Sequence, residues 1–414
     1  LVGIVLLVGL VAGLYPAFYL SSFRPIKALR STQGSRSGSP VFRKILMVTQ
    51  FVISILLIIS TVTVFRQVRF MRHKDWGIKT DHILNFELRG GLRSNYRAIR
   101  ERLLQDPGIK EISKCNFALD KSFGVKPDWE GKDPDRDVFF SLISVDFNFQ
   151  KVFDLQMLEG RYFSREFATD ATDAVIINEE AARVMGMEDP LGKFLSCPLP
   201  FDPDRNGPII GVVKDYHFKS LHQPIHPLVL VVAPGWMTDM YVRIAPDNLQ
   251  STLVSIEKTI RTSAPDFPFE FRFLDQEIDA LYQAEVRIEK LVRFGTGLGI
   301  LIACLGLFGL ASFLAEQRTK EIGIRKILGS SQREIVFIFS KEFAIWVGAA
   351  NLFAWPLAYY AMNGWLQGFP FRIELDFLTF IFSGAAALFI ALFTISFQTI
   401  RAASANPVDA LRYE

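Results

Sequence analysis

The chain has 414 residues, of which 50% are hydrophobic, 38 are phenylalanine and only 21% are charged. This composition is more apolar than that of an average soluble domain and argues against a soluble enzyme. The net charge of +3 at pH 7 is small, but a small total can combine segments of opposite sign, so the positions of the charges carry the information.

Five stretches of about 20 residues or more contain no Asp, Glu, Lys or Arg, and this is the length that an α-helix needs to cross a membrane. They are 1–20, 45–65, 294–315, 343–371 and 377–400. The fourth contains Pro356 and several Trp and Tyr residues, which is typical of a kinked span that ends at the membrane interface. Buried helices of a soluble core are the alternative, but five such runs in one chain would be unusual. The sequence therefore predicts a polytopic α-helical membrane protein with five spans.

The distribution of Lys and Arg predicts the orientation of these spans, because cytoplasmic loops are rich in basic residues. Segments 21–44, 316–342 and 401–414 together carry 14 basic and six acidic residues. Segment 66–293 carries 31 basic and 35 acidic residues, and the loop 372–376 has a charge of −1. We therefore expect the first three segments and the C-terminus in the cytoplasm, and segment 66–293 outside.

A short motif occurs twice, each time directly after a predicted span. Residues 25–30 and 407–412 both read P-x-x-A-L-R. Repeats of this kind generate pseudo-symmetric halves in membrane proteins. We expect the first span to be the last helix of a preceding module, residues 41–414 to form one module of four spans, and a missing first half of similar length. The Gly- and Ser-rich stretch 31–40 between them fits a flexible tether.

Segment 66–293 has the pattern of a mixed α+β domain. The strand-like runs are 83–88, 138–144, 174–177, 209–213, 228–232 and 240–244, and the helix-like runs are 94–105, 178–185 and 248–263. At its edges, 66–74 and 277–293 continue the neighbouring spans as helix-compatible runs. We expect these two helices to form a stalk; a single amphipathic helix lying on the bilayer is the alternative.

Motifs for enzymatic chemistry are missing or incomplete. The run from Gly186 to Lys193 departs from a phosphate-binding loop in spacing and lacks its Ser or Thr. The glycines at 295, 297 and 299 lie in a predicted span, where small residues favour close helix packing. The histidines at 217, 222 and 226 match no established metal-ligand spacing, so an exposed loop is favoured. Cys115 and Cys197 lack a disulfide framework, although a bond between them stays open.

The loop between the third and fourth spans is the most informative segment. Residues 317–328 form a two-faced helix with an apolar stripe, and Gly329 is a natural helix stop. Ser331 and Glu334 form a capping-box pattern that starts the next helix. A basic helix resting on anionic lipid is one interpretation. A helix framed so tightly by two membrane helices favours docking into a partner.

This loop resembles that of the FtsX/MacB-like ABC transporter permease family. The resemblance is carried by R-T-K-E-I-G-I-R-K-I-L-G at 318–329 and N-P-V-D-A-L-R-Y-E at 406–414. The outer segment is similar to the MacB-like periplasmic core domain, through L-E-G-R-Y-F-S at 158–164, A-V-I-I-N-E at 174–179, P-L-G-K at 190–193 and G-V-V-K-D-Y-H-F at 211–218. The similarity extends over residues 41–414 in the same order.

The resemblance implies a permease of the bacterial inner membrane whose coupling helix docks a separate cytoplasmic ABC ATPase dimer. By that implication the docking residues are Arg318, Lys320, Glu321, Ile322, Gly323, Arg325, Lys326, Leu328 and Gly329. ATP would be bound by the partner, and this chain would hold no catalytic residue, cofactor or metal. The other expected partners are the lipid bilayer, a second permease module in a longer chain or a dimer, and a periplasmic partner or cargo, but no nucleic acid.

The expected organisation follows the spans and loops in chain order. It comprises the last helix and tail of a preceding module (1–30), a linker (31–44), a span with an outward stalk (45–75), the outer α+β domain (76–276), a second stalk and span (277–315), the coupling loop (316–342), two spans (343–400) and a C-terminal tail (401–414).

Two functions of another class stay open at this point. A receptor with a ligand-binding outer domain is one, but the longest cytoplasmic segment, 316–342, is too short for a signalling enzyme domain. A membrane-anchored enzyme is the other, and it would need a nucleophile or metal cluster that the sequence does not display. The cargo of a transporter is not indicated by any motif.

Overall fold

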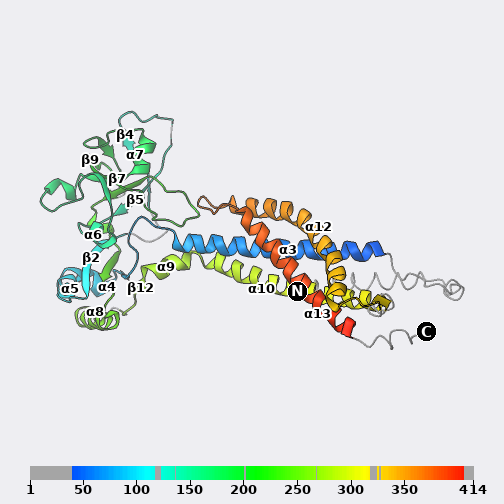
Figure 1. The fold of residues 1–414 in the computed structure, drawn as a ribbon. Helices are drawn as coiled ribbons and strands as arrows, with labels where there is room; N and C mark the ends of the chain where they lie inside the picture. The colour runs from blue at the N-terminus through cyan, green and yellow to red at the C-terminus, as the bar shows by residue number, and fades with distance from the viewer. Residues whose placement is uncertain are drawn as a thin grey trace, which may run out of the picture. The chain divides into compact units, whose positions relative to one another are not determined.

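The computed structural model describes residues 40–116, 123–135, 137–199, 202–266, 268–317, 324–325 and 328–404 (Figure 1). Four helices in this part of the chain are long and apolar enough to cross a membrane. They are α3 (Pro40–His73), α10 (Gln283–Gln317), α12 (Gln332–Leu366) and α13 (Phe377–Ser404). They coincide with four of the five predicted spans. The predicted span 1–20 and both copies of the repeated motif lie outside the described residues.

The chain divides into two compact units that cut across these helices. One unit holds Ser54–Ile302 and Phe353–Ala386, and the other holds the remaining described residues. In the second unit, α3 and α10 approach closely at Gly306, where an added Cβ would come 2.7 Å from the side chain of Gln50. Thr394 of α13 donates a hydrogen bond to the sulfur of Cys304 at 3.7 Å. Polar and small residues therefore hold these apolar helices together.

In the first unit, a polar contact joins the same two helices. The hydroxyl oxygens of Thr61 and Thr296 are 2.5 Å apart, and Thr296 also donates to the carbonyl of Leu57 at 3.1 Å. A Cβ on Gly299 would lie 2.9 Å from Leu57, so the predicted close packing is confirmed at this glycine. Among the described residues, none lies within 4 Å of the corresponding position at Gly295 or Gly297.

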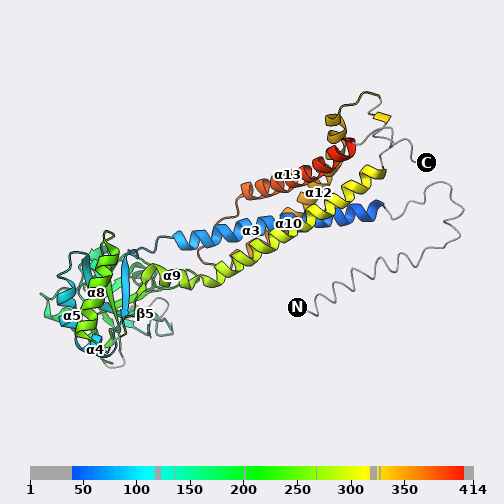
Figure 2. The same cartoon turned by 90° about the horizontal axis from the view of Figure 1, so that it is seen from below.

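The outer part of the first unit contains a four-stranded antiparallel sheet in the order β12-β1-β11-β2. Its strands are β1 (Ile83–Glu87), β2 (Ile109–Cys115), β11 (Asp239–Ile244) and β12 (Arg272–Phe273). One face is covered by α4 (Gly90–Ser94), α5 (Tyr96–Leu103) and α8 (Leu249–Ser263), as Figures 1 and 2 show. Alternate residues of β1 (Leu84 and Phe86) and of β11 (Met240, Val242 and Ile244) point to this helical layer, as the two-residue period of a strand requires.

A larger mixed sheet follows the order β3-β5-β10-β7-β9-β8-β4, with β6 paired to β9. Its strands are β3 (Phe123–Val125), β4 (Asp128–Trp129), β5 (Phe140–Ser144), β6 (Met157–Gly160), β7 (Val175–Asn178), β8 (Phe194–Ser196), β9 (Asn206–Val213) and β10 (Leu228–Val231). The β5/β10 and β7/β9 pairs are parallel and the others are antiparallel. Short helices α6 (Phe149–Phe153) and α7 (Glu179–Met185), and the 3-10 turns Ala168–Ala171 and Pro234–Trp236, complete the domain. All six predicted strands and all three predicted helices of the domain are confirmed.

Of the two helices predicted for the stalk, the one that continues α3 is confirmed and the unbroken helix over 277–293 is wrong. Helix α3 continues outward to His73, as predicted. The predicted unbroken helix over 277–293 is interrupted, because α9 (Leu274–Leu281) ends before Tyr282 and α10 begins after it. Tyr282 is fully buried, and its hydroxyl accepts a hydrogen bond from the backbone N–H of Leu221 at 3.0 Å. Burial of Leu274 and Ile278 in the domain core also argues against a helix lying on the bilayer.

Candidate functional site

The predicted coupling loop is described at its C-terminal end. Arg325, Leu328 and Gly329 are among the described residues, whereas Arg318, Lys320, Glu321, Ile322, Gly323 and Lys326 lie outside them. Of the two apolar side chains described on the predicted stripe, Ile324 is 52% exposed and Leu328 is 79% exposed. The end of the loop therefore presents apolar surface that the described chain does not cover.

The described end of the coupling loop has the hydrogen-bond pattern of a Schellman motif. The N–H of Ser330 donates to the carbonyl of Arg325 at 2.9 Å, spanning Gly329, whose φ is +92°. Glycine adopts this left-handed conformation without the steric cost that a Cβ brings. The predicted helix stop at Gly329 is confirmed.

The predicted capping box at the start of α12 is also confirmed. The N–H of Glu334 donates to the hydroxyl of Ser331 at 3.3 Å, and the N–H of Ser331 donates to the carboxylate of Glu334 at 3.1 Å. Two backbone donors at the helix start are thus satisfied reciprocally. Only Ser330 and Ser331 separate the glycine stop from the first residue of α12, so the connection has little freedom to change direction.

A second cluster lies where the outer domain meets the outer ends of the membrane helices, and we call it the joint. It comprises Gln67, Trp76, His217, Leu221, His222, Tyr282, Glu285, Phe369 and Phe371. One hydrophobic core cluster contains residues of both sheets together with Met71 of α3, Ile278 of α9 and Phe369 of the α12–α13 loop. The joint is therefore a continuation of the domain core and not a flexible tether.

Gln67 ties the loop between α12 and α13 to α3. Its side-chain amide donates to the carbonyl of Phe371 at 2.9 Å, and its carbonyl accepts from the N–H of Ile373 at 2.9 Å. The residue is fully buried, so both bonds form away from water. Nearby, Arg66 donates to the hydroxyl of Thr379 at 2.8 Å. The predicted fourth span extends to 371, but α12 ends at Leu366, and the aromatic residues after it belong to the joint.

The histidine-containing loop of the outer domain packs into the joint. His217 is only 7% exposed, and its ring lies 4.8 Å from that of Phe371 and 6.1 Å from that of Trp76. His222 is hydrogen-bonded to Glu285 of α10 at 2.9 Å, and its ring lies 5.2 Å from that of Phe369. The predicted exposed loop is therefore wrong, because these aromatic partners come from segments distant in sequence. Within the described chain, no group of three His, Cys, Asp or Glu side chains is arranged to hold a metal.

Asn178 supports this loop from the large sheet. Its side-chain amide donates to Asp215 at 2.7 Å and to the carbonyl of His226 at 3.1 Å. Its side-chain carbonyl accepts from the N–H groups of Ala181 and Leu228 at 3.0 and 2.8 Å. Burial and the neighbouring carboxylates raise the pKa of Asp215. The motifs 174–179 and 211–218 thus meet at one buried hydrogen-bond node.

Burial of His217 predicts a pH-dependent stability. Burial, and secondarily the charge of Lys74, lowers the pKa of His217 to about 4. In the unfolded chain the pKa of His217 is near its ordinary 6.5, so the unfolded chain binds a proton at higher pH than the folded chain. The free energy of unfolding therefore decreases as pH falls from about 6.5 towards 4. By linkage this loss is about 2 kcal/mol between pH 7 and pH 5. Thermal unfolding at pH 7 and pH 5 should show this loss of stability in the wild type and not in His217→Phe. An equal loss in both proteins would contradict the assignment of the pH dependence to His217.

Cys115 and Cys197 are not joined by a disulfide and lie in separate clusters. Cys115 is buried in the core that includes the joint, and Cys197 is buried in the core on the other face of the large sheet. Burial raises the pKa of the Cys197 thiol to about 12. A thiol with this pKa is protonated and unreactive at neutral pH.

Residues 293–407 match the FtsX-like permease C-terminal family. The macrolide export ATP-binding/permease protein MacB of Haemophilus ducreyi is 26% identical over 301 residues, which cover 66% of this chain and 40% of that protein. The protein of the same name from Bdellovibrio bacteriovorus is 24% identical over 280 residues, covering 62% and 41%. The chain therefore spans about two fifths of the length of these curated relatives.

Solved structures are also similar to about half of this chain. The periplasmic region of MacB from Actinobacillus actinomycetemcomitans has a TM-score of 0.36 and 16% identity, and covers 50% of this chain and 94% of its own. The extracellular domain of the noncanonic ABC-type transporter YknZ from Gram-positive bacteria has a TM-score of 0.33 and 16% identity, and covers 46% and 97%.

Proposed function

We propose, on the premise that this chain is an FtsX/MacB-like permease, that it is the membrane-spanning subunit of an ABC transporter. ATP hydrolysis would occur on a separate cytoplasmic subunit that docks on the coupling loop. The curated relatives carry both an ATP-binding part and a permease part in their names, and this chain spans only about two fifths of their length. The C-terminus and the coupling loop would lie in the cytoplasm, and residues 66–293 outside, as the distribution of Lys and Arg favours.

The docking part of the proposal is supported by the local geometry of the loop. Ile324 and Leu328 are exposed apolar side chains at the described end of the loop, which the Schellman motif and the capping box fix in place. Apolar residues projecting from a rigid helix are typical of docking into a groove. A helix lying on lipid would gain nothing from a connection that fixes its direction.

The proposal that the chain transmits motion rests on the positions at which the two helices flanking the loop begin and end. Helix α10 starts beside Tyr282 and Glu285 in the joint and ends at Gln317, just before the coupling loop. Helix α12 starts at the capping box and ends at Leu366, just before the joint residues Phe369 and Phe371. Each helix therefore links the loop to the joint through one continuous backbone, so a displacement of the loop reaches the outer domain.

The proposed transmission can be separated from docking by a substitution in the joint. Gln67→Leu removes both hydrogen bonds to the α12–α13 loop while keeping a side chain of similar size. We expect ATPase stimulation by the permease to persist, while the nucleotide-dependent distance change between spin labels on α8 and on the inner end of α3 falls by at least half. The matched control is Gln276→Leu on the exposed face of α9. Unchanged distances in Gln67→Leu would contradict transmission through the joint, and failure of the wild type to bind or stimulate its ATPase would contradict the proposed function itself.

A further inference from the structure

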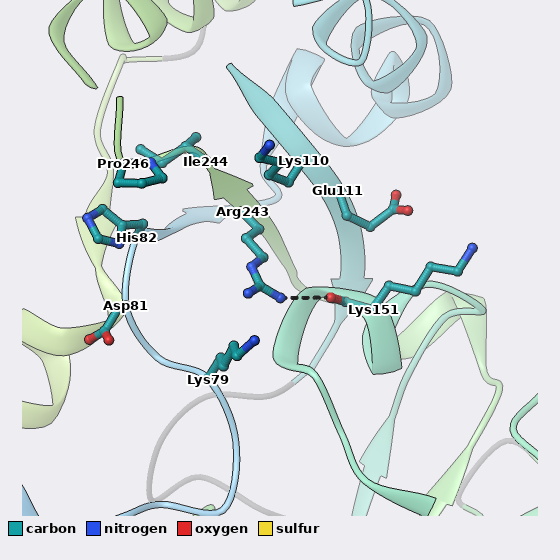
Figure 3. A pocket seen from close by; sticks show the side chains of 9 residues that line it. All are labelled: Lys79, Asp81, His82, Lys110, Glu111, Lys151, Arg243, Ile244 and Pro246. Carbon is teal, nitrogen blue, oxygen red and sulfur yellow. Dashed lines mark hydrogen bonds between the residues drawn. The ribbon is translucent and has the colours of Figure 1, made fainter. Parts of the chain in front are cut away.

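A cavity of 580 Å³ opens on the outer domain beside the segment that connects α3 to β1 (Figure 3). Its walls come from four places: Lys79 and Asp81 on the connecting segment, Lys110 and Glu111 on β2, the end of α6, and Arg243 on β11. A cavity of this size holds a small organic ligand.

The charges that line the cavity are mainly positive. Four of its residues are Lys or Arg (Lys79, Lys110, Lys151 and Arg243) and two are acidic (Asp81 and Glu111). Glu111 is already paired with Arg100 at 3.0 Å, and Figure 3 shows both acidic side chains pointing away from the centre. Segment 66–293 as a whole has 31 basic and 35 acidic residues, so the positive cavity is a local reversal of the domain's charge.

Arg243 is held in place with part of its guanidinium unused. Its Nη1 donates to the carbonyls of Lys151 and Val152 at 3.2 and 3.4 Å, which fixes the group at the end of α6. Among the described residues, Nε and Nη2 of Arg243 have no hydrogen-bond acceptor. These two donors form one edge of the planar fork that binds an oxyanion through two parallel bonds.

Lys79 points towards Arg243 across the cavity (Figure 3). Its ammonium pairs with the carboxylate of Asp154 at 2.7 Å, and both side chains are more than half exposed. An exposed pair of this kind contributes little stability and exchanges easily. Lys110, on the rim, has no ion-pair partner in the part of the chain that the structure describes.

We propose that this cavity binds the phosphate group of an anionic ligand, with Arg243 and Lys79 as direct donors and Lys110 adding positive charge at the rim. A planar carboxylate is satisfied by one arginine, whereas the several oxygens of a phosphate use donors that converge from different elements. Asp154 occupies Lys79 in the absence of ligand and competes with it. The phosphate belongs either to a soluble phosphoester or to a lipid headgroup.

The alternative is that these cations only neutralise Asp154 and the carbonyls at the end of α6. The two explanations predict opposite effects of Asp154→Asn. If the cations only neutralise Asp154, the substitution creates no anion site. If the cavity is a phosphate site, the substitution removes the carboxylate that competes for Lys79, and phosphate binds more tightly. Asparagine is suited to this test because Asp154 has a φ of 53°, which asparagine tolerates.

The experiment is a calorimetric titration of the full chain in a neutral detergent with inorganic phosphate and with glycerol phosphate. We expect Lys79→Gln to raise Kd about tenfold, the loss of one charge-assisted hydrogen bond, and Arg243→Gln, which removes both donors of the fork, to raise it by at least as much. Asp154→Asn should lower Kd several-fold. The control is Lys151→Gln, because that side chain extends away from Arg243 in Figure 3, and its Kd should change by less than about twofold by screened charge alone.

A second arm identifies the source of the phosphate. Nanodiscs containing phosphatidylglycerol should compete with glycerol phosphate if the ligand is lipid-borne, and nanodiscs of phosphatidylcholine alone serve as the reference. Equal binding in both kinds of nanodisc assigns the site to a soluble phosphoester. Phosphate binding that is absent in the wild type, or unchanged in Lys79→Gln and Asp154→Asn, would overturn the proposal. Because both of these side chains are exposed, loss of folding does not obscure that result.

Discussion

Replacing Asn178 by alanine is expected to lower the free energy of unfolding of the outer domain by about 3 kcal/mol or more. The side chain is fully buried and makes four hydrogen bonds, to Asp215, to the carbonyl of His226 and to the N–H groups of Ala181 and Leu228. Alanine would leave both N–H groups without that acceptor and would remove the cap of α7. Thermal unfolding in detergent, followed by tryptophan fluorescence, measures the change.

The matched control is Asn95→Ala in the same domain. Asn95 is exposed and makes one side-chain hydrogen bond, to the carbonyl of Ser263 at 2.8 Å. Its loss should cost about 1 kcal/mol or less. Because the node at Asn178 also holds the loop that carries His217 and His222, Asn178→Ala should weaken outward transmission as well. Equal stability of the two variants would show that the node is not a major support of the fold.

Replacing Leu328 by aspartate is expected to reduce stimulation of the partner ATPase at least tenfold. Leu328 is the most exposed apolar residue described on the coupling loop, and a central apolar anchor of an interface commonly contributes about 2 kcal/mol to binding. A carboxylate at this position would have to lose its hydration in the docked complex. The measurement is ATP hydrolysis by the purified ATPase at increasing concentrations of permease in nanodiscs.

Leu328→Met is the control for this substitution, because methionine keeps an apolar side chain of similar size. It should retain stimulation within about twofold. The thermal midpoint of the outer domain should be the same in both variants, since Leu328 lies outside the domain core. Full stimulation by Leu328→Asp would show that the apolar end of the loop does not bind the ATPase.

The parts of the fold that were predicted correctly depend on local patterns. Strands such as β10 and β11 are dense in Val, Leu and Ile and are bounded by turn residues, so their positions are visible in the sequence. Strand β2 was missed, because its sequence I-K-E-I-S-K-C contains three charged residues and a serine. Its apolar positions become recognisable only beside β11, which buries them between α5 and the rest of the sheet.

The end of the coupling loop was also predictable for a local reason. A glycine in the left-handed conformation and a serine paired with a glutamate three positions later act within a few residues of themselves. Their chemistry needs no information about the rest of the chain. The sequence therefore indicated both where the helix stops and where α12 begins.

The joint could not be predicted because its contacts join segments far apart in the chain. Gln67 bonds to residues more than 300 positions away, and Glu285 meets His222 across 63 positions. The signals that were available are weak ones: a glutamine at the outer end of an apolar span, and aromatic residues at the end of the predicted fourth span. Neither signal identifies the residue that is contacted, because one sequence does not reveal which distant residue hydrogen-bonds to a buried side-chain amide.

The interruption at Tyr282 has a mechanical consequence. Helix α9 is anchored in the core of the outer domain through Leu274 and Ile278, whereas α10 belongs to the membrane-spanning set. On the other side of the stalk, α3 stops at His73 and the chain continues to β1 without a helix. Both supports of the domain therefore lose their helical backbone at residues buried in its core, Tyr282 on one side and Trp76 and Ile78 on the other. A tilt of the membrane helices would act on this shared core and move the domain as one body, and its sheets would keep their shape.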